Sequence, residues 1–483
     1  MTNAITDSAE SDAGRIGGGG IWLIGAAILL AWFPILKGYP LVADEYTFRA
    51  LGEGGLAGVV RLVKDMGIWR SLGMPIQAVA AMHPAVVPWV AIVMHVAVCL
   101  LLFRLVQLFG ADHGIARVAA LLFGVFPFGY QCLVNTMCIP MMLTTGLLLG
   151  WMWLLMEEPS RCGPAAMACL GAAVGFVSGC VYESLVFCFA ASGIVAFLVR
   201  HELDVRRPGL RGHIWAAVGA MVGAGLYLAL YRLVPGPARP LSPVFNPESL
   251  LGAWWWQWSN VWVFEPWLLG KARSLMFYDW GWGQAVIAAA LGAVVIVLAA
   301  RLRGPEASAV PWSGRRKWAG WAGIVLLLLS ASLVFVFVGY STDTRKKYCL
   351  LPLGLLAGCR LLAEFPRAAG VIRGRIAAIS AGLVAMGVAT TWLILGVYRF
   401  EITRYEALLA YLRGAGSPSR VELCSDGSTD APWPRMPYTL GAGFFEGWVL
   451  GEGLQPPLRA PLDVSFGPNG VRYDPATRTW AAQ

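Results

Sequence analysis

Residues 84–109 read PAVVPWVAIVMHVAVCLLLFRLVQLF, and they carry the clearest structural signal in the chain. This block is almost wholly apolar, and its one Arg, Arg104, lies near the C-terminal end. A run of about 18 or more apolar residues is long enough to cross a bilayer as a helix. We therefore predict that this block is a transmembrane helix.

Further apolar blocks on both sides predict an all-α polytopic membrane protein with about eleven transmembrane helices. The composition agrees, because 58% of the 483 residues are hydrophobic and only 13% are charged. A soluble domain carries about twice that share of charge. The other blocks lie near residues 20–37, 114–130, 136–156, 164–181, 184–200, 213–233, 282–301, 318–338, 348–364 and 377–397.

The loops between these blocks alternate in charge, and this alternation predicts the orientation of the chain. Short loops rich in Lys and Arg, such as 200–213 and 301–317, alternate with longer loops rich in acidic residues and Trp, such as 38–83 and 234–281. Basic loops tend to stay in the cytoplasm. We therefore expect a cytoplasmic N-terminus, a C-terminus on the outer side, and loops 38–83 and 234–281 on that outer side.

This orientation divides the chain into three predicted parts. Residues 1–19 are polar and Gly-rich, as expected for a disordered cytoplasmic leader. Residues 20–397 form the transmembrane domain, and residues 398–483 are long enough for a small soluble outer domain. The net charge of +9 does not indicate nucleic-acid binding, because no basic helix with interleaved aromatic residues is present.

Three segments outside the apolar blocks also have recognisable patterns. Residues 55–66 place four apolar side chains on one helical face, and with residues 69–82 they predict interfacial helices in the first outer loop. The Trp-rich residues 254–280 indicate an aromatic belt or a platform for a lipid or sugar. In the tail, residues 404–414 predict an amphipathic helix and residues 420–427 a strand and turn.

Two adjacent carboxylates, Asp44 and Glu45, lie in the loop just after the first predicted span. A carboxylate at this position is suited to act as a general base toward an acceptor hydroxyl or amine. The alternative is a solvated helix N-terminus, which the helix dipole favours. Arg70 and His83 lie in the same outer loop and are candidate substrate-binding partners.

A run of three cations, Arg345, Lys346 and Lys347, lies on the predicted outer side, against the positive-inside rule. Clusters of Arg and Lys bind phosphate, so the run predicts an anion site. Tyr340 and Tyr348 flank it and are candidate hydrogen-bond donors to the anion. The alternative is a solvated loop.

Glu183 stands in GCVYESLVF, in a tight outer turn between two apolar blocks. A charge at this depth is costly and usually functional, although it is also suited to cap the next helix. On one membrane face the sequence thus collects carboxylates and a phosphate-binding run. This combination suits the transfer of a sugar from a lipid phosphate carrier.

Taken together, these motifs resemble the GT-C superfamily of integral membrane glycosyltransferases, which includes the protein O-mannosyltransferases and the lipid A aminoarabinose transferases. The resemblance rests on ADEYTFR at 43–49, the stretches 69–106 and 126–150, Glu183, and RKKYCLLPLGLLAG at 345–358. It covers most of the membrane region to about residue 365.

The resemblance implies an inverting glycosyltransferase with a polyprenyl-phosphate-linked sugar donor and a glycan, lipid or protein acceptor. It implies transfer at the periplasmic face of a bacterial inner membrane, with Asp44 as general base beside Glu45 and with Arg345 on the carrier phosphate. The resemblance also implies that Arg70 and Glu183 bind the substrate. Some members use a divalent metal. No second DxD-type carboxylate pair is visible in this sequence, which favours an enzyme without a metal.

Three other functions stay open at this stage. A polymerase or ligase of lipid-linked glycans would also use outer Arg residues, but it would not depend on Asp44. A transporter or flippase would need charged residues at mid-membrane depth, which are nearly absent from the spans. A membrane scaffold would leave the outer cation run unexplained.

Overall fold

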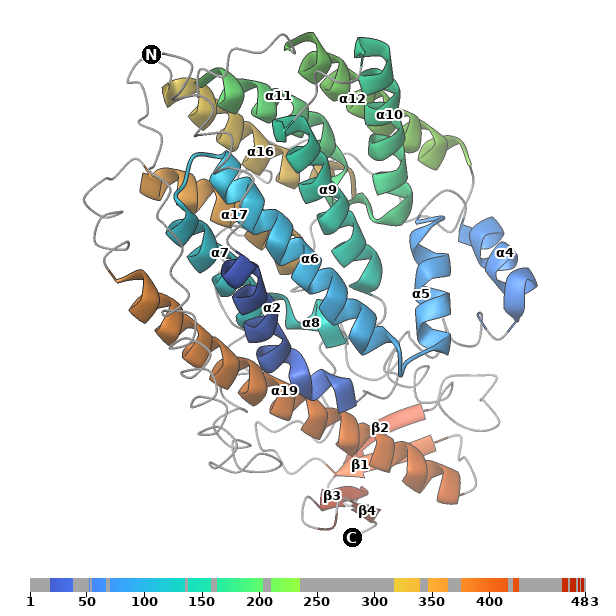
Figure 1. The fold of residues 1–483 in the computed structure, drawn as a ribbon. Helices are drawn as coiled ribbons and strands as arrows, with labels where there is room; N and C mark the ends of the chain where they lie inside the picture. The colour runs from blue at the N-terminus through green and yellow to red at the C-terminus, as the bar shows by residue number, and fades with distance from the viewer. Residues whose placement is uncertain are drawn as a thin grey trace, which may run out of the picture.

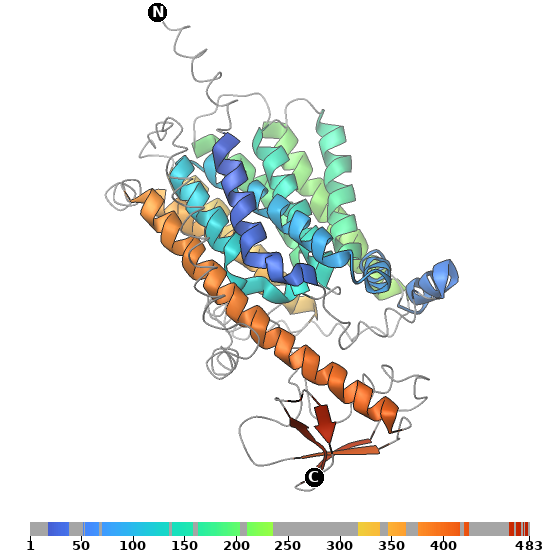
Figure 2. The same cartoon turned by 60° about the horizontal axis from the view of Figure 1, so that its bottom comes forward.

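The computed structural model shows a helical bundle with a small group of strands beyond one end (Figures 1 and 2). It describes residues 18–37, 52, 54–66, 70–134, 138–157, 163–202, 210–234, 317–338, 346–363, 375–415, 420–424, 463–467, 470–474, 477 and 479–481. Its helical elements are α2 (Gly18–Trp32), η1 (Phe33–Lys37), α4 (Gly55–Met66), α5 (Gly73–Met82), α6 (Val87–Leu108), α7 (His113–Val125), η2 (Pro127–Gly129), α8 (Tyr130–Val134), α9 (Ile139–Glu157), α10 (Pro164–Val181), η5 (Glu183–Leu185), α11 (Val186–Glu202), α12 (Leu210–Leu233), α16 (Lys317–Val338), α17 (Lys346–Ala363) and α19 (Ile376–Gly414).

Six of the described helical segments are long and apolar enough to cross a membrane: Val87–Leu108, Ile139–Glu157, Pro164–Val181, Glu183–Arg200, Arg211–Leu233 and Ile376–Gly396. The chain is therefore a multi-pass helical membrane protein. Every predicted span contains a described helix except 282–301, which lies outside the described residues. The count of eleven crossings stays a prediction, because several of the apolar helices are shorter than a crossing.

The predicted first outer loop contains two helices, as its sequence pattern predicts. Helices α4 and α5 pack on each other and lie at the edge of the bundle (Figure 2). The side chains of Val60, Arg61 and Lys64 on α4 are exposed. That these two helices lie at the membrane interface stays a prediction.

Helices α10 and α12 pack backbone to backbone through small residues. A Cβ atom added at Gly171 would lie 2.4 Å from the carbonyl oxygen of Ala216, and one at Gly219 would lie 2.0 Å from that of Ala168. Gly175 and Gly223 meet the other backbone just as closely. Such close approach is how helices associate where lipid removes the hydrophobic driving force.

Helix α7 ends inside the bundle, which corrects the prediction of one continuous span at 114–130. Pro127 disfavours helical geometry at Phe126, whose ψ is 144°, so α7 stops at Val125 and η2 and α8 follow. The freed carbonyl of Gly124 accepts hydrogen bonds from Trp32 Nε1 at 2.7 Å and from His95 Nε2 at 3.0 Å. These side chains replace the helical bonds that the end of α7 lacks.

Helix α19 is continuous for 39 residues and runs from the bundle to the C-terminal strands (Figure 2). The predicted span at 377–397 and the predicted helix at 404–414 are thus one helix, so the expected domain boundary near 398 falls within it. No Pro interrupts this stretch. The predicted strand at 420–427 is confirmed by β1.

The strands form two small sheets beside the end of α19. Strand β1 (Arg420–Cys424) pairs in parallel with β2 (Asp463–Gly467), and β3 (Arg472–Asp474) pairs antiparallel with β4 (Thr479–Ala481). Their buried side chains lie in one apolar cluster with those of the end of α19: Leu408, Leu409, Leu412, Val421, Val471 and Trp480. This cluster also includes the buried side chains of the bundle, so the tail packs onto α19 as a continuation of the same core.

Candidate functional site

Glu183 opens η5, the short turn between α10 and α11, and only 6% of its surface is exposed. The turn is buried throughout, since Ser184 and Leu185 are also covered. A carboxylate in such a place needs a charged or hydrogen-bonding partner. The predicted position of Glu183 in a tight turn between apolar helices is confirmed.

Arg70, which lies just before α5, supplies that partner. Its Nε donates to Glu183 Oε2 at 2.9 Å and its Nη2 donates to Oε1 at 2.8 Å. This two-pronged geometry is the strongest form of an arginine–carboxylate pair. The guanidinium also lies 4.3 Å from the centroid of the Tyr182 ring, a favourable cation–π contact. Sequence reasoning named both charged residues but did not predict their pairing.

The backbone next to Arg70 also packs against α10. Arg70 has φ = 47°, in the left-handed region that a non-glycine residue adopts at a cost of about 1–3 kcal/mol. The Leu72 amide donates to the Cys180 carbonyl at 3.0 Å, and a Cβ at Gly73 would lie 2.1 Å from the Val181 oxygen. The start of α5 therefore docks directly on the end of α10.

We call the end of the bundle where η5 lies the η5 end. Helix α17 contacts η5. The Cys349 thiol at the start of α17 lies 3.9 Å from the Met141 carbonyl oxygen at the start of α9, and Ser330 Oγ in α16 lies 3.5 Å from the Cys188 sulfur near the start of α11. The Arg70–Glu183 pair and the start of α17 thus share the η5 end.

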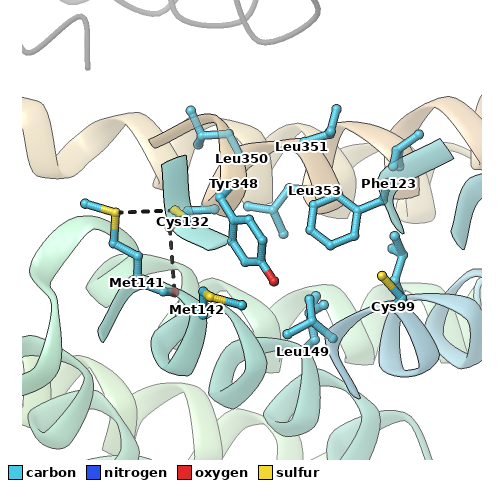
Figure 3. Packing of buried hydrophobic residues seen from close by; sticks show 14 of the residues in the cluster. Cys99, Phe123, Cys132, Met141, Met142, Leu149, Tyr348, Leu350, Leu351 and Leu353 are labelled. Atoms are coloured by element: carbon cyan, nitrogen blue, oxygen red, sulfur yellow. Dashed lines mark hydrogen bonds between the residues drawn. The ribbon is translucent and has the colours of Figure 1, made fainter. Parts of the chain in front are cut away.

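Tyr348 directly follows the cation run in the sequence, and its side chain lies inside the bundle. Only 1% of the residue is exposed, and its ring packs among core side chains such as Phe123, 5.2 Å away between ring centroids (Figure 3). Its hydroxyl lies 2.9 Å from His95 Nδ1. The hydroxyl already has a partner inside the bundle, so Tyr348 supports α17 from within.

The other predicted site residues are placed only in part. His83 is exposed and joins α5 to α6, with its carbonyl accepting from the Val86 amide at 3.0 Å. Lys346 and Lys347 begin α17. The remaining candidates lie outside the described residues: Asp44, Glu45, Tyr340 and Arg345. Their roles, and the substrate-binding role of His83, stay predictions.

Sequence reasoning missed His95 and Tyr227, which the structure brings into the core. His95 was visible as a lone imidazole in the apolar block 84–109, and ionisable groups inside spans are usually significant. Tyr227 is 1% exposed, and its ring covers Gly179 near the η5 end. Among the described residues its hydroxyl has no hydrogen-bond partner.

The described part of the chain contains no group of three or more His, Cys, Asp or Glu side chains that could hold a metal ion. The preference for a metal-free enzyme stays a prediction. No family model matches the chain, and no curated protein or solved structure matches it. The fold thus defines the class, a multi-pass helical membrane protein, and the activity has to be argued from the residues.

Proposed function

We propose that the chain is an inverting membrane glycosyltransferase of the GT-C type. It transfers a sugar from a polyprenyl-phosphate carrier to a glycan, lipid or protein acceptor at the periplasmic face of a bacterial inner membrane. The observation that carries the proposal is the partly buried Arg70–Glu183 pair. It ties the loop that bears Asp44 and Glu45 to the end of the bundle at which α17 and its cations begin.

The chemistry follows from these groups. The Asp44 carboxylate takes the proton from the acceptor hydroxyl or amine as that atom attacks the anomeric carbon of the sugar. A new bond forms to the anomeric carbon, and the bond from that carbon to the phosphate oxygen breaks. The bonding electron pair leaves with the carrier phosphate, whose charge Arg345 and its neighbouring lysines stabilise.

Arg70 and Glu183 support this chemistry by position. Because Glu183 is nearly buried, its charge keeps Arg70 in one orientation, and the strained backbone of Arg70 is held against α10. A loop fixed in this way can hold a reacting carboxylate close to its substrate, which contributes to catalysis by reducing the entropy of approach.

The test uses the purified full chain in nanodiscs with radiolabelled undecaprenyl-phosphate sugars. We expect Asp44→Asn to bind the lipid but to abolish transfer, and Arg345→Ala to weaken lipid binding. Matched controls are Glu422→Gln on strand β1 and Lys64→Ala on α4, two exposed charges that should leave both steps unchanged. Unaltered binding and transfer in both site variants would refute the proposal.

A transporter or flippase is the second candidate, and one observation favours it. Helix α7 ends within the bundle, and helices interrupted at membrane depth recur at the binding sites of transporters. Liposomes with a fluorescent polyprenyl-phosphate sugar separate the two functions. Movement of the lipid between leaflets without transfer of its sugar would favour the flippase.

A further inference from the structure

The buried end of α7 is connected to the start of α17 through His95. This histidine lies in the middle of α6 and is 1% exposed. Its Nε2 lies 3.0 Å from the Gly124 carbonyl oxygen, and its Nδ1 lies 2.9 Å from the Tyr348 hydroxyl oxygen. Three helices, α6, α7 and α17, therefore meet at one imidazole.

The two contacts determine the proton positions on the imidazole. A carbonyl oxygen only accepts, so Nε2 carries the hydrogen that it donates to Gly124. In a neutral ring, Nδ1 is then an acceptor, and the Tyr348 hydroxyl donates to it. Both ring nitrogens and the tyrosine hydroxyl are satisfied in this arrangement. A buried polar group that lost its partner here would be destabilising.

Helix α17 needs such a contact because Pro352 lies inside it. Proline has no amide hydrogen, so the carbonyl of Tyr348 lacks its usual helical donor four residues later. The backbone of the first turn of α17 thus lacks one of its helical hydrogen bonds. The side chains of Tyr348 and Cys349 attach that turn to α6 and α9 instead.

We propose that His95 is a positioning residue for binding of the carrier phosphate. Through Tyr348 it fixes the first turn of α17 and thereby the backbone that carries Lys346 and Lys347 and follows Arg345. This inference rests on the proposed function. It assigns Tyr348 an indirect role, in place of direct hydrogen bonding to the phosphate.

The test measures binding of undecaprenyl phosphate and the KM and kcat of transfer in nanodiscs. In Tyr348→Phe and His95→Gln the hydrogen bond between the two side chains is lost or misaligned. We expect each to raise Kd and KM about five- to ten-fold with little change in kcat, since one hydrogen bond is at stake. His95→Asn keeps an oxygen near the Nδ1 position and should stay closer to the wild type. The double variant His95→Gln/Tyr348→Phe should be no weaker than either single variant.

Thr391→Val is the matched control, because Thr391 on α19 donates its hydrogen bond to the carbonyl of Val125 on α7, and this bond does not involve α17. It should lower Tm and leave Kd unchanged. Normal lipid binding in folded Tyr348→Phe would overturn the inference, as would weak binding in Tyr348→Phe but not in His95→Gln. If the wild-type chain itself does not bind the lipid phosphate, the proposed function fails and the inference fails with it.

Discussion

The guanidinium of Arg70 donates two hydrogen bonds, of 2.9 and 2.8 Å, to the carboxylate of Glu183, although the two residues are 113 positions apart in the chain. The pair joins the segment before α5 to the turn between α10 and α11. It is one of the contacts that attach the predicted catalytic loop to the bundle.

Removing one partner of this pair should be strongly destabilising. We expect Glu183→Ala to cost about 3 kcal/mol, because the mostly buried guanidinium loses its counter-charge. The double variant Arg70→Met/Glu183→Leu should recover part of that loss. Thermal unfolding followed by Trp fluorescence measures both.

The control is the Arg104–Glu157 pair, which is 3.5 Å apart and about one third exposed. Glu157→Ala should change stability by no more than about 1 kcal/mol. Equal losses in Glu157→Ala and Glu183→Ala would contradict the special role of the buried pair.

The α10–α12 contact should not tolerate a single added methyl group. Gly219→Ala places Cβ against the Ala168 carbonyl, and overpacking of this kind costs about 1–3 kcal/mol. Gly225→Ala on the same helix meets nothing within 4 Å and should be neutral or slightly stabilising. The Tm values of the two variants decide the matter. Similar values would mean that the two helices are not in backbone contact.

His113, which precedes the apolar part of α7, should make stability depend on pH. Burial lowers the pKa of its imidazole, and the nearby Arg117 lowers it further. Gln107 Nε2 lies 2.8 Å from Nδ1 and donates to the neutral ring. Below the unfolded pKa of about 6.5 the unfolded chain binds the proton more readily, so stability falls as the pH drops.

Unfolding midpoints from pH 8 to 5 measure this effect, with His113→Asn as the comparison. The variant should show a smaller loss of Tm on acidification than the wild type. Parallel curves for the two proteins would show that His113 does not contribute.

Tyr227→Phe should leave stability unchanged or raise it. The tyrosine hydroxyl is buried without a hydrogen-bond partner in the described part of the chain, and such a group costs about 1–3 kcal/mol. Phenylalanine keeps the ring that covers Gly179. The Tm of the variant is the measurement, and a clear fall would reveal a partner for the hydroxyl.

Several local features were predictable from sequence because each depends on a short stretch of chain. The helices at 55–66 and 87–108, the buried turn at Glu183 and the strand at 420–424 follow from apolar spacing, length and turn residues. Pro127 signals the break after Val125, but the long apolar block around it led to the prediction of one continuous span. The start of a span at Tyr348 was readable, but the contact of its hydroxyl with His95 was not, because 253 residues separate the two in the chain.

The sequence by itself determined that this chain is a multi-pass helical membrane protein, since a helix in lipid has to be long and apolar and has to satisfy its own backbone hydrogen bonds. Only the tertiary structure decided which polar side chains meet. Arg70 reaches Glu183, and His95 links Gly124 to Tyr348, because the packing of helices brings distant segments together. Those contacts depend on how helices cross and how closely they approach, which no local pattern of residues encodes.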